Sequence, residues 1–210
     1  MPLYSFVDAK THLKKRVGNR SDITDSEYGK YVNQAQQVMA TNVKGLEPFD
    51  MLSAGKTIPP NTDNIAIAST LTLPTLWAIE GIRNQTTRQR MWRADWLELS
   101  RLPTPLPVGP LTRWVRRYGL LYFFSTSPTP TELFFYYRRV ATPDVLEVPD
   151  EWFEHLLNLA AVFIYPTIGR NKERDDLFKK LPSQLQLGAL NPLTATQWEA
   201  LNDQNLGFYA

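Results

Sequence analysis

The sequence predicts an α+β fold, in which a helical bundle built from both ends of the chain carries an inserted β-rich meander. Apolar residues recur every three or four positions before residue 45 and again after residue 149, which is the spacing of amphipathic helices. Between these regions, short segments rich in aromatic and β-branched residues alternate with Gly and Pro, as strands and turns do. Helices followed by strands and then by helices favour a segregated α+β architecture over an alternating α/β one.

The composition limits the class of protein. The 210 residues are 43% hydrophobic and 21% charged, which is typical of a globular chain, and one domain is the default at this length. A formal charge of +2 is too small to imply a polyanionic partner. The absence of cysteine excludes disulfides, thiolate metal sites and cysteine nucleophiles. No apolar run approaches the ~18 residues that span a bilayer, so we expect a soluble protein made in the cytoplasm.

Two helices are expected in the N-terminal region. The first covers residues 5–17, with an apolar stripe made of Phe6, Ala9, Leu13 and Val17. The second covers residues 25–44, because Thr24 and Glu27 have the spacing of a capping box just before an apolar stripe. We expect the opposite face of this helix, which carries Gln, Asn and Lys, to be exposed to solvent.

The central region predicts strands. A loop is expected from Phe49 to about residue 64, where Gly, Pro and Asn gather. The strands that follow are expected at residues 65–71, 76–82, 88–91, 114–118, 120–125 and 133–140. Gly119 lies between two of these segments, as in a tight hairpin turn. A brief helix at residues 94–99 is expected before the proline-rich stretch 103–110.

Helices return after the strands. The segment Val148–Trp152 places proline and acidic residues in the first turn of a helix, where the helix dipole favours them. The expected buried stripe comprises Trp152, Leu156, Leu159, Ala160 and Phe163, so we expect Trp152 to belong to the core. Pro166 and Gly169 mark the end of this helix or a kink in it, and a charged helix follows from Asn171. Pro182 starts a further short turn or helix that reaches residue 190.

Basic and aromatic residues are interleaved at two places in the strand region. These are Arg116-Arg117-Tyr118 and Tyr136-Tyr137-Arg138-Arg139. Such residues stack on nucleic-acid bases, but they are equally suited to ordinary cross-strand pairs within a sheet. A nucleic-acid-binding module that uses this block of arginine and aromatic residues therefore remains an alternative function.

The sequence offers no catalytic constellation. It lacks the glycine-rich phosphate loops, the nucleophile elbow and the His-Glu-x-x-His motif. Glu151 and His155 lie one helical turn apart, but a metal site needs at least one more ligand, and an ion pair or solvated face is the simpler interpretation. Acidic pairs such as Asp95 with Glu98, or Asp175 with Asp176, occur on almost any helix surface. We therefore expect a protein that is not an enzyme, with no catalytic, metal-binding or cofactor-binding residues.

The segment Val148–Leu157, Val-Pro-Asp-Glu-Trp-Phe-Glu-His-Leu-Leu, completes a series of shorter motifs. The earlier members of the series are Leu73–Pro74, Asp95–Leu99, Trp114–Phe123, Leu133–Arg139 and Pro143–Asp144. In order and spacing, this series resembles the adaptor, or head-to-tail connector, family of tailed bacteriophages, whose long helix opens with a similar Leu-Pro-Asp-Glu-Trp-His. The expected helices at 5–17 and 25–44 fit the family as well. The sequence departs from the family at Tyr165-Pro166 and after about residue 182.

The resemblance implies a structural virion protein. Its copies are expected to form a ring, a dodecamer, between the portal protein and the tail or nozzle proteins in the neck of the virion, with no membrane partner. Helices packed side by side would line part of a channel for the genomic DNA, so the ring would serve tail assembly and genome ejection. A contact between identical subunits that closes by rotation buries surface on every copy, which makes such a ring physically reasonable.

The same resemblance suggests a division of the chain. Residues 1–190 are expected to form the adaptor domain, with helices at 5–17, 25–44 and 149–181 and a β-rich insertion at about 56–140. Residues 191–210 carry another capping-box pattern and an apolar end, and we expect them to form a C-terminal docking tail that reaches toward the portal. The candidate partner-binding residues are Trp198, Leu201, Leu206, Phe208 and Tyr209.

Overall fold

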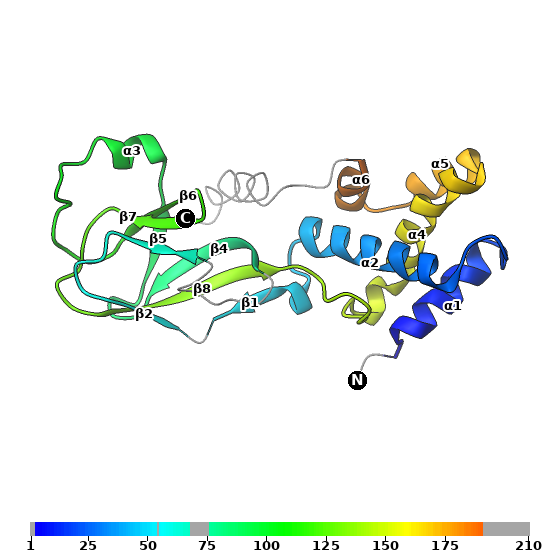
Figure 1. Cartoon of the computed structure of the whole chain (residues 1–210), viewed down its shortest axis with the longest axis horizontal. Helices are drawn as coiled ribbons and strands as arrows, with labels where there is room; N and C mark the ends of the chain where they lie inside the picture. Colours follow the sequence, from blue (N-terminus) through cyan, green and yellow to red (C-terminus); the bar gives the residue numbers. More distant parts are fainter. Residues whose placement is uncertain (1–2, 54, 68–75, 191–210) are drawn as a thin grey trace. The chain divides into compact units, whose positions relative to one another are not determined.

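The computed structural model describes residues 3–53, 55–67 and 76–190, and it divides the chain into two compact units (Figure 1). The helical unit contains the described residues up to Asp50 and from Arg139 onward, and the β unit contains Met51–Arg138. N-terminal helices pack against C-terminal helices in the first unit, and a curled sheet forms the second. The predicted α+β class is therefore confirmed.

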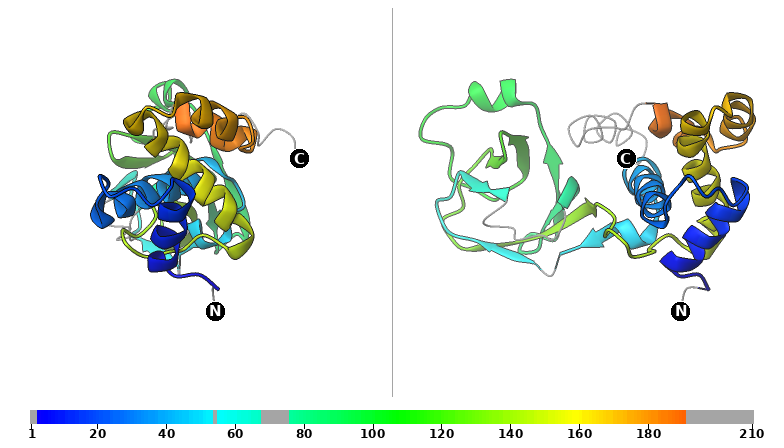
Figure 2. Two further views of the ribbon diagram at one scale, coloured as in Figure 1. Left: turned by 90° about the vertical axis from the view of Figure 1, so that its right-hand side faces the viewer. Right: turned by 45° about the vertical axis from the view of Figure 1, so that its right-hand side comes forward.

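Five helices form the helical unit in the described part of the chain. They are α1 (Phe6–Arg16), α2 (Asp25–Asn42), α4 (Phe153–Ile164), α5 (Asn171–Phe178) and α6 (Ser183–Leu190). Short 3-10 turns lie at Glu47–Phe49, Asp150–Trp152 and Tyr165–Ile168. Helix α2 packs against α1, α4 and α6, as the left view of Figure 2 illustrates.

Local sequence signals explain where the first two helices begin. Thr24 and Glu27 form the predicted capping box, so α2 begins at Asp25 as expected. A second capping box at Ser5 and Asp8 starts α1, with the Asp8 carboxylate accepting the Ser5 backbone N–H at 2.8 Å. Each box satisfies backbone N–H groups that the first turn of a helix leaves unpaired.

The core of the helical unit corrects the expectation for Trp152. Trp152 is only partly buried, because it lies in the 3-10 turn that precedes α4. The next residue, Phe153, is 3% exposed and stacks on Tyr4, with ring centroids 3.9 Å apart and planes inclined by 2°. Phe163 is also only partly buried, whereas Leu156, Leu159 and Ala160 are fully buried as predicted.

The C-terminal helices follow the expected breaks. Helix α4 ends at Ile164, and Gly169 adopts a left-handed conformation with φ 71° after the 3-10 turn that contains Pro166, so the helix ends where an end or a kink was expected. Helix α6 then packs closely on α2. A Cβ atom at Gly188 would lie 2.6 Å from the Asn42 side chain, so this approach requires glycine.

The β unit contains eight described strands and one short helix. The strands are β1 (Asp50–Leu52), β2 (Lys56–Ile58), β3 (Asn64–Ala66), β4 (Leu76–Asn84), β5 (Gln89–Arg93), β6 (Arg113–Arg117), β7 (Leu120–Phe123) and β8 (Thr131–Arg139). Their order is β1-β8-β4-β5-β6-β7-β3, with β2 also pairing with β8. The right view of Figure 2 shows the sheet curling on itself.

Two antiparallel hairpins, β4–β5 and β6–β7, match the predicted strand segments. Tyr118 and Gly119 form the second hairpin turn with φ values of 51° and 75°, the left-handed pair that a tight hairpin turn requires. Strand β8 lies between β1 and β4 instead of beside β7, and β5 pairs with β6 in parallel. The parallel pair needs a long connection, which residues 94–112 provide through α3 (Trp96–Ser100) and the proline-rich stretch.

The loop expected before residue 64 contains the short strands β1 and β2, which the sequence analysis missed. The strand expected at 65–71 begins as β3, and residues 68–75 lie outside the described part of the chain. The core of the β unit includes Trp114, Phe123 and Phe135, each 1% exposed or less.

Candidate functional site

The residues considered for chemistry have structural roles. His12 lies edge-on to Tyr4 and Phe153, at centroid distances of 6.0 and 5.7 Å, and His155 lies 5.4 Å from the Trp152 ring. Glu151 is exposed, and no group of three potential metal ligands occurs among the described residues. The sequence analysis favoured an ion pair or a solvated face for Glu151 and His155, whereas His155 is partly buried and packs beside Trp152.

At least one carboxylate of each acidic pair is engaged in local structure. Asp95 caps α3 by accepting the Leu97 backbone N–H at 2.9 Å, and Glu98 forms an ion pair with Arg113. Asp175 pairs with Arg174 at 2.6 Å. Each of these carboxylates therefore stabilises local structure, and neither pair presents two free carboxylates to a substrate.

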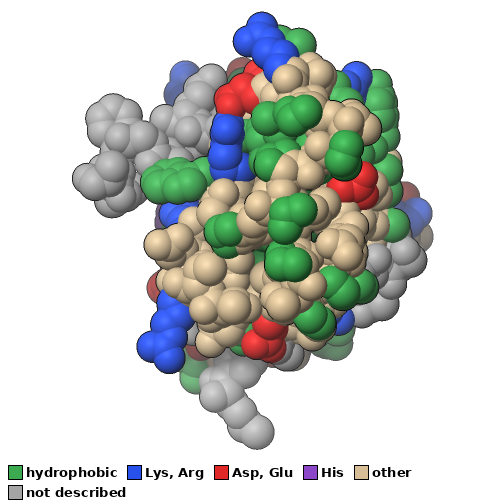
Figure 3. Space-filling view, turned by 90° about the vertical axis from the view of Figure 1, so that its left-hand side faces the viewer, with side chains coloured by type: hydrophobic (Ala, Val, Ile, Leu, Met, Phe, Trp, Pro, Cys, Tyr) green, Lys and Arg blue, Asp and Glu red, His purple; other side chains and the backbone are tan. Residues whose placement is uncertain are grey.

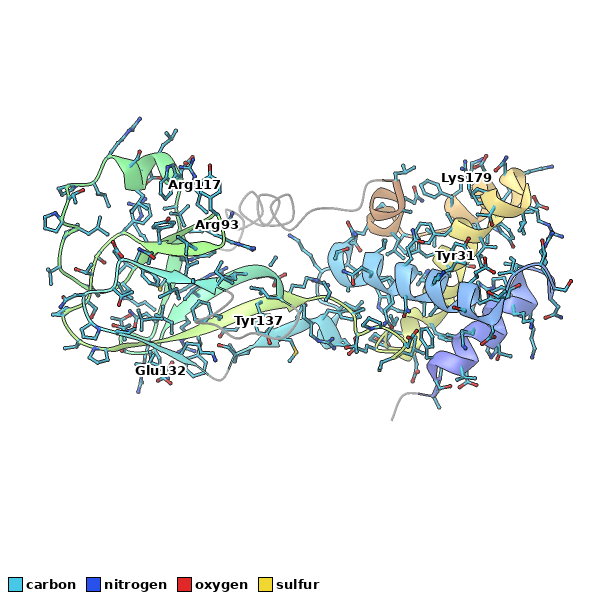
Figure 4. All side chains as sticks on the ribbon, in the orientation of Figure 1. Tyr31, Arg93, Arg117, Glu132, Tyr137 and Lys179 are labelled. Atoms are coloured by element: carbon cyan, nitrogen blue, oxygen red, sulfur yellow. The ribbon has the colours of Figure 1, made fainter. Side chains whose placement is uncertain are left out.

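One half of the arginine and aromatic block forms an ordered surface beside α3. The Arg117 guanidinium lies 4.3 Å from the Trp96 ring centroid and 4.8 Å from that of Tyr118. At the start of the same strand, β6, Arg113 lies 4.4 Å from the Phe124 ring, and on the neighbouring strand β5 Arg93 lies 5.5 Å from the Trp114 ring. Figure 4 labels Arg117 and Arg93 in this part of the β unit. Such contacts fix guanidinium groups in place while their edges remain available for hydrogen bonds.

The other half of the block does not form a surface. Tyr137 and Arg138 are 4% and 0% exposed, and Arg139 pairs with Glu147 at 2.7 Å in the helical unit. Only Tyr136, at 42%, is exposed in this stretch. The interleaved pattern therefore does not provide a continuous stacking platform for bases, because two consecutive residues of this stretch are buried and a third is held in an ion pair.

The β unit is rich in arginine. Residues 51–138 contain nine Arg and one Lys against five acidic residues, whereas the rest of the chain contains 13 basic and 16 acidic residues. Protein–protein interfaces are enriched in Arg, Tyr and Trp and depleted in Lys relative to other surface. The composition of this unit therefore favours contact with protein.

The proline-rich loop at the end of the β unit is uncharged. Residues 102–112 contain no charged side chain, and the exposed residues there include Pro103, Pro105, Pro107, Val108 and Pro110. Figure 3, which views this end of the unit, shows hydrophobic and uncharged side chains at its centre and charged ones toward its edge. Exposed apolar surface bordered by polar groups is typical of a contact site.

An apolar groove lies within the helical unit. A cavity of about 240 Å³ is lined by Val162, Phe163, Pro166, Arg174, Asp175, Phe178, Ala189 and Leu190. Leu190, at its rim, is 69% exposed. The candidate tail residues from Trp198 to Tyr209 follow this position and lie outside the described residues.

A polar network attaches the loop at 140–148 to helix α2. Gln36, which is fully buried, donates to the Val145 carbonyl at 2.8 Å and accepts the Glu147 backbone N–H at 2.9 Å. Asn33 forms a similar reciprocal pair with Asp144. The expectation that the amide face of this helix is exposed was wrong at Gln36, because the loop returning from β8 covers it.

Glu147 gives this network a pH dependence. Burial opposes ionisation, but the Arg139 guanidinium and the N–H and O–H of Thr142 outweigh it and hold the pKa of Glu147 below its ordinary value. A lowered pKa in the folded state stabilises the protein above the unfolded-state pKa, and this stabilisation is lost as pH falls through the folded-state pKa.

We therefore expect Glu147→Gln to lower the free energy of unfolding by about 2 kcal/mol near neutral pH, the typical contribution of hydrogen bonds to a charged group. The difference from the wild type should shrink at an acidic pH below the lowered folded-state pKa of Glu147, where both proteins are uncharged at this position. Urea unfolding at the two pH values measures this. Equal differences at both pH values would contradict a role for the carboxylate charge.

Comparison with known families supports the resemblance inferred from the motifs. A family model described as the SU10 adaptor protein matches residues 4–206. The match includes the kink at Tyr165-Pro166 and continues past residue 182, so the similarity extends further than the motifs had indicated. A search of curated proteins gave no match. In the described residues, no helix has the length and apolar character needed to cross a bilayer.

The family and the geometry agree. The matched family is one of structural adaptors and not of enzymes, and Asp95, Glu98 and Asp175, which were considered for catalysis, are engaged in a helix cap and ion pairs. The match covers nearly the whole chain, including the helices of both chain ends and the sheet between them. This chain therefore belongs to the SU10 adaptor protein family and is a phage head-to-tail adaptor.

Proposed function

We propose that copies of this chain assemble into a ring, a dodecamer, in the neck of the virion between the portal protein and the tail or nozzle proteins. The family match over residues 4–206 carries this proposal, because an adaptor acts by binding other virion proteins. In this role the ring lines part of the channel through which the genomic DNA passes and serves tail assembly and genome ejection.

The helical unit has surface suited to contact between copies. Within the described residues, no other segment fills the apolar groove beside Phe163 and Phe178, and Val7 and Leu190 are 63% and 69% exposed. A ring requires each subunit to offer two different surfaces, one to each neighbour, and both to bury apolar area. We assign the groove and its rim at Leu190 to one of these surfaces.

Nucleic-acid binding by the arginine and aromatic block is the less favoured function. Tyr137 and Arg138 are buried, and the Arg117 guanidinium lies over one face of the Trp96 ring and one face of the Tyr118 ring. A nucleic-acid-binding module would bind DNA as an isolated subunit with an affinity that falls steeply with salt. Negative-stain imaging of the chain mixed with portal rings, together with DNA titrations at two salt concentrations, separates the two functions.

We expect Leu190→Glu to prevent ring formation without unfolding the subunit. Leu190 is 69% exposed, so the charge is tolerated in the monomer but opposes burial of the groove rim against another copy. Analytical ultracentrifugation in the presence of portal rings measures the assembly. Leu97→Glu is the matched control, because Leu97 is 61% exposed in the β unit and should assemble as the wild type does. If the Leu190→Glu variant forms rings to the same extent as the wild type, the groove rim at Leu190 is not a contact between copies.

A further inference from the structure

The hairpin formed by β4 and β5 carries a cavity whose polar lining is dominated by arginine. The cavity has a volume of about 470 Å³ and is lined by Glu80, Gly81, Arg83, Arg88, Arg90 and Tyr136. All of these residues belong to the β unit. Arg83, Arg88 and Arg90 are exposed, so their guanidinium groups are accessible to a partner.

The arrangement of these arginines is unfavourable for the isolated subunit. Arg83 and Arg90 are direct partners across the antiparallel pair, and like charges in that position repel each other. Arg88 adds a third positive charge from the turn. Within the described part of the chain, none of these three side chains forms an ion pair or a side-chain hydrogen bond. An anionic ligand would relieve this repulsion.

The single acid in the cavity lining is already engaged. Glu80 Oε1 lies 3.8 Å from Nη1 of Arg138, which is fully buried and needs a counter-charge in the protein interior. Glu80 therefore balances Arg138 inside the sheet, and the charge of the three exposed arginines remains for a ligand from outside.

The hairpin holds the cavity in a fixed shape. Asn84 is 1% exposed; its side-chain oxygen accepts the backbone N–H groups of Thr86 and Thr87 at 3.0 and 3.2 Å. Its amide donates to the Leu111 carbonyl at 3.0 Å, so the turn is tied to the neighbouring chain segment. Arg90 lies over Gly81, where a Cβ atom would be 3.5 Å from Nη2. A binding site formed in advance loses less entropy when its ligand binds.

We propose that this cavity, the arginine socket, binds carboxylate side chains of an acidic segment of a partner protein. Guanidinium groups bind carboxylates through two parallel hydrogen bonds, and Tyr136 offers a hydroxyl and an apolar ring at the wall. The scarcity of lysine favours a protein over DNA, because a phosphate backbone is bound by lysine and arginine alike. The identification of the partner as another virion protein rests on the proposed adaptor role. The proposal that the cavity binds anions does not depend on that role.

The test uses the full chain and two fluorescent probes, a hexaglutamate peptide and a short DNA duplex, with binding followed by anisotropy. We expect the peptide to bind in low salt and its affinity to fall about tenfold or more in Arg83→Ala and in Arg90→Ala, as loss of a charge-assisted contact does. Arg90→Lys should recover only part of the affinity, because it retains charge without the paired geometry. Arg101→Ala, an exposed arginine of the same unit outside the socket, is the matched control and should bind as the wild type does.

Two results would overturn the proposal. The first is that the peptide binds the wild type and both alanine variants equally, or binds none of them at millimolar concentration. The second is that the duplex binds more tightly than the peptide and loses affinity in the same variants, which would assign the socket to a phosphate backbone. Ring formation with portal, measured on Arg90→Ala in parallel, reports on the adaptor role separately, so failure of one proposal is distinguishable from failure of the other.

Discussion

Replacing Phe153 with alanine is expected to lower the free energy of unfolding by about 3–5 kcal/mol, the range for removing a buried aromatic side chain. Phe153 is 3% exposed and lies in a stack with Tyr4, while His12 meets the ring edge-on. Its removal would leave a cavity between the chain's first residues and α4, which the rigid helices on either side cannot fill. Urea unfolding followed by tryptophan fluorescence measures the change.

Trp152→Ala provides the control for this prediction. Trp152 is larger than Phe153 but only partly buried, so its loss removes fewer contacts and should cost roughly 1–2 kcal/mol. A larger effect at Trp152 than at Phe153 would mean that Trp152 is the core residue after all. Equal stability of Phe153→Ala and the wild type would contradict the stacked arrangement of this core.

The correction at Trp152 illustrates what a local pattern predicts well and where it fails. Proline and acidic residues correctly indicated a helical start after Val148, but the first turn is a 3-10 turn and α4 begins at Phe153. Each residue turns an α-helix by about 100°, so a small change in the start of a helix moves a different side chain into the core. By contrast, α2 was predicted to its first residue, because a capping box is a contact between residues three apart.

Elements that depend on distant partners were not predictable in this way. Strands β1 and β2 have three residues each, and pairing with β8, about 80 residues later, is what makes them strands. Gln36 has the polarity of a surface residue, and its burial depends on a loop more than 100 residues away. Sequence periodicity carries no information about such contacts.

The same distinction between local patterns and distant contacts applies to the function and the candidate sites. The overall function could be predicted from the order of motifs, because a family conserves that order along the chain. The arginine socket could not, since it depends on the register that places Arg83 opposite Arg90. The sequence did contain one indication of this site. Residues 51–138 contain nine arginines and one lysine, and this excess of arginine distinguishes the β unit from the helices, which contain most of the lysines.

Truncation after Leu190 is expected to abolish attachment to portal-bearing heads while leaving the subunit folded. The described core ends before this point, since Leu181 and Leu185 are buried and Leu190 is 69% exposed. The shortened chain retains α6 and its close packing on α2 at Gly188. Its melting temperature should therefore stay close to that of the full chain.

The loss of attachment follows from the chemistry of the removed segment. The candidate docking residues are Trp198, Leu201, Leu206, Phe208 and Tyr209. At ~25 cal/mol per Å² of apolar surface, burial of even two aromatic side chains contributes several kcal/mol of docking energy per copy, and a ring repeats that contribution in every subunit. Co-sedimentation with portal rings measures attachment, and a chain with Phe208 and Tyr209 both replaced by alanine should show an intermediate loss. If the truncated chain unfolds or aggregates instead, residues 191–210 belong to the core of the subunit, and a docking tail is the wrong description of them.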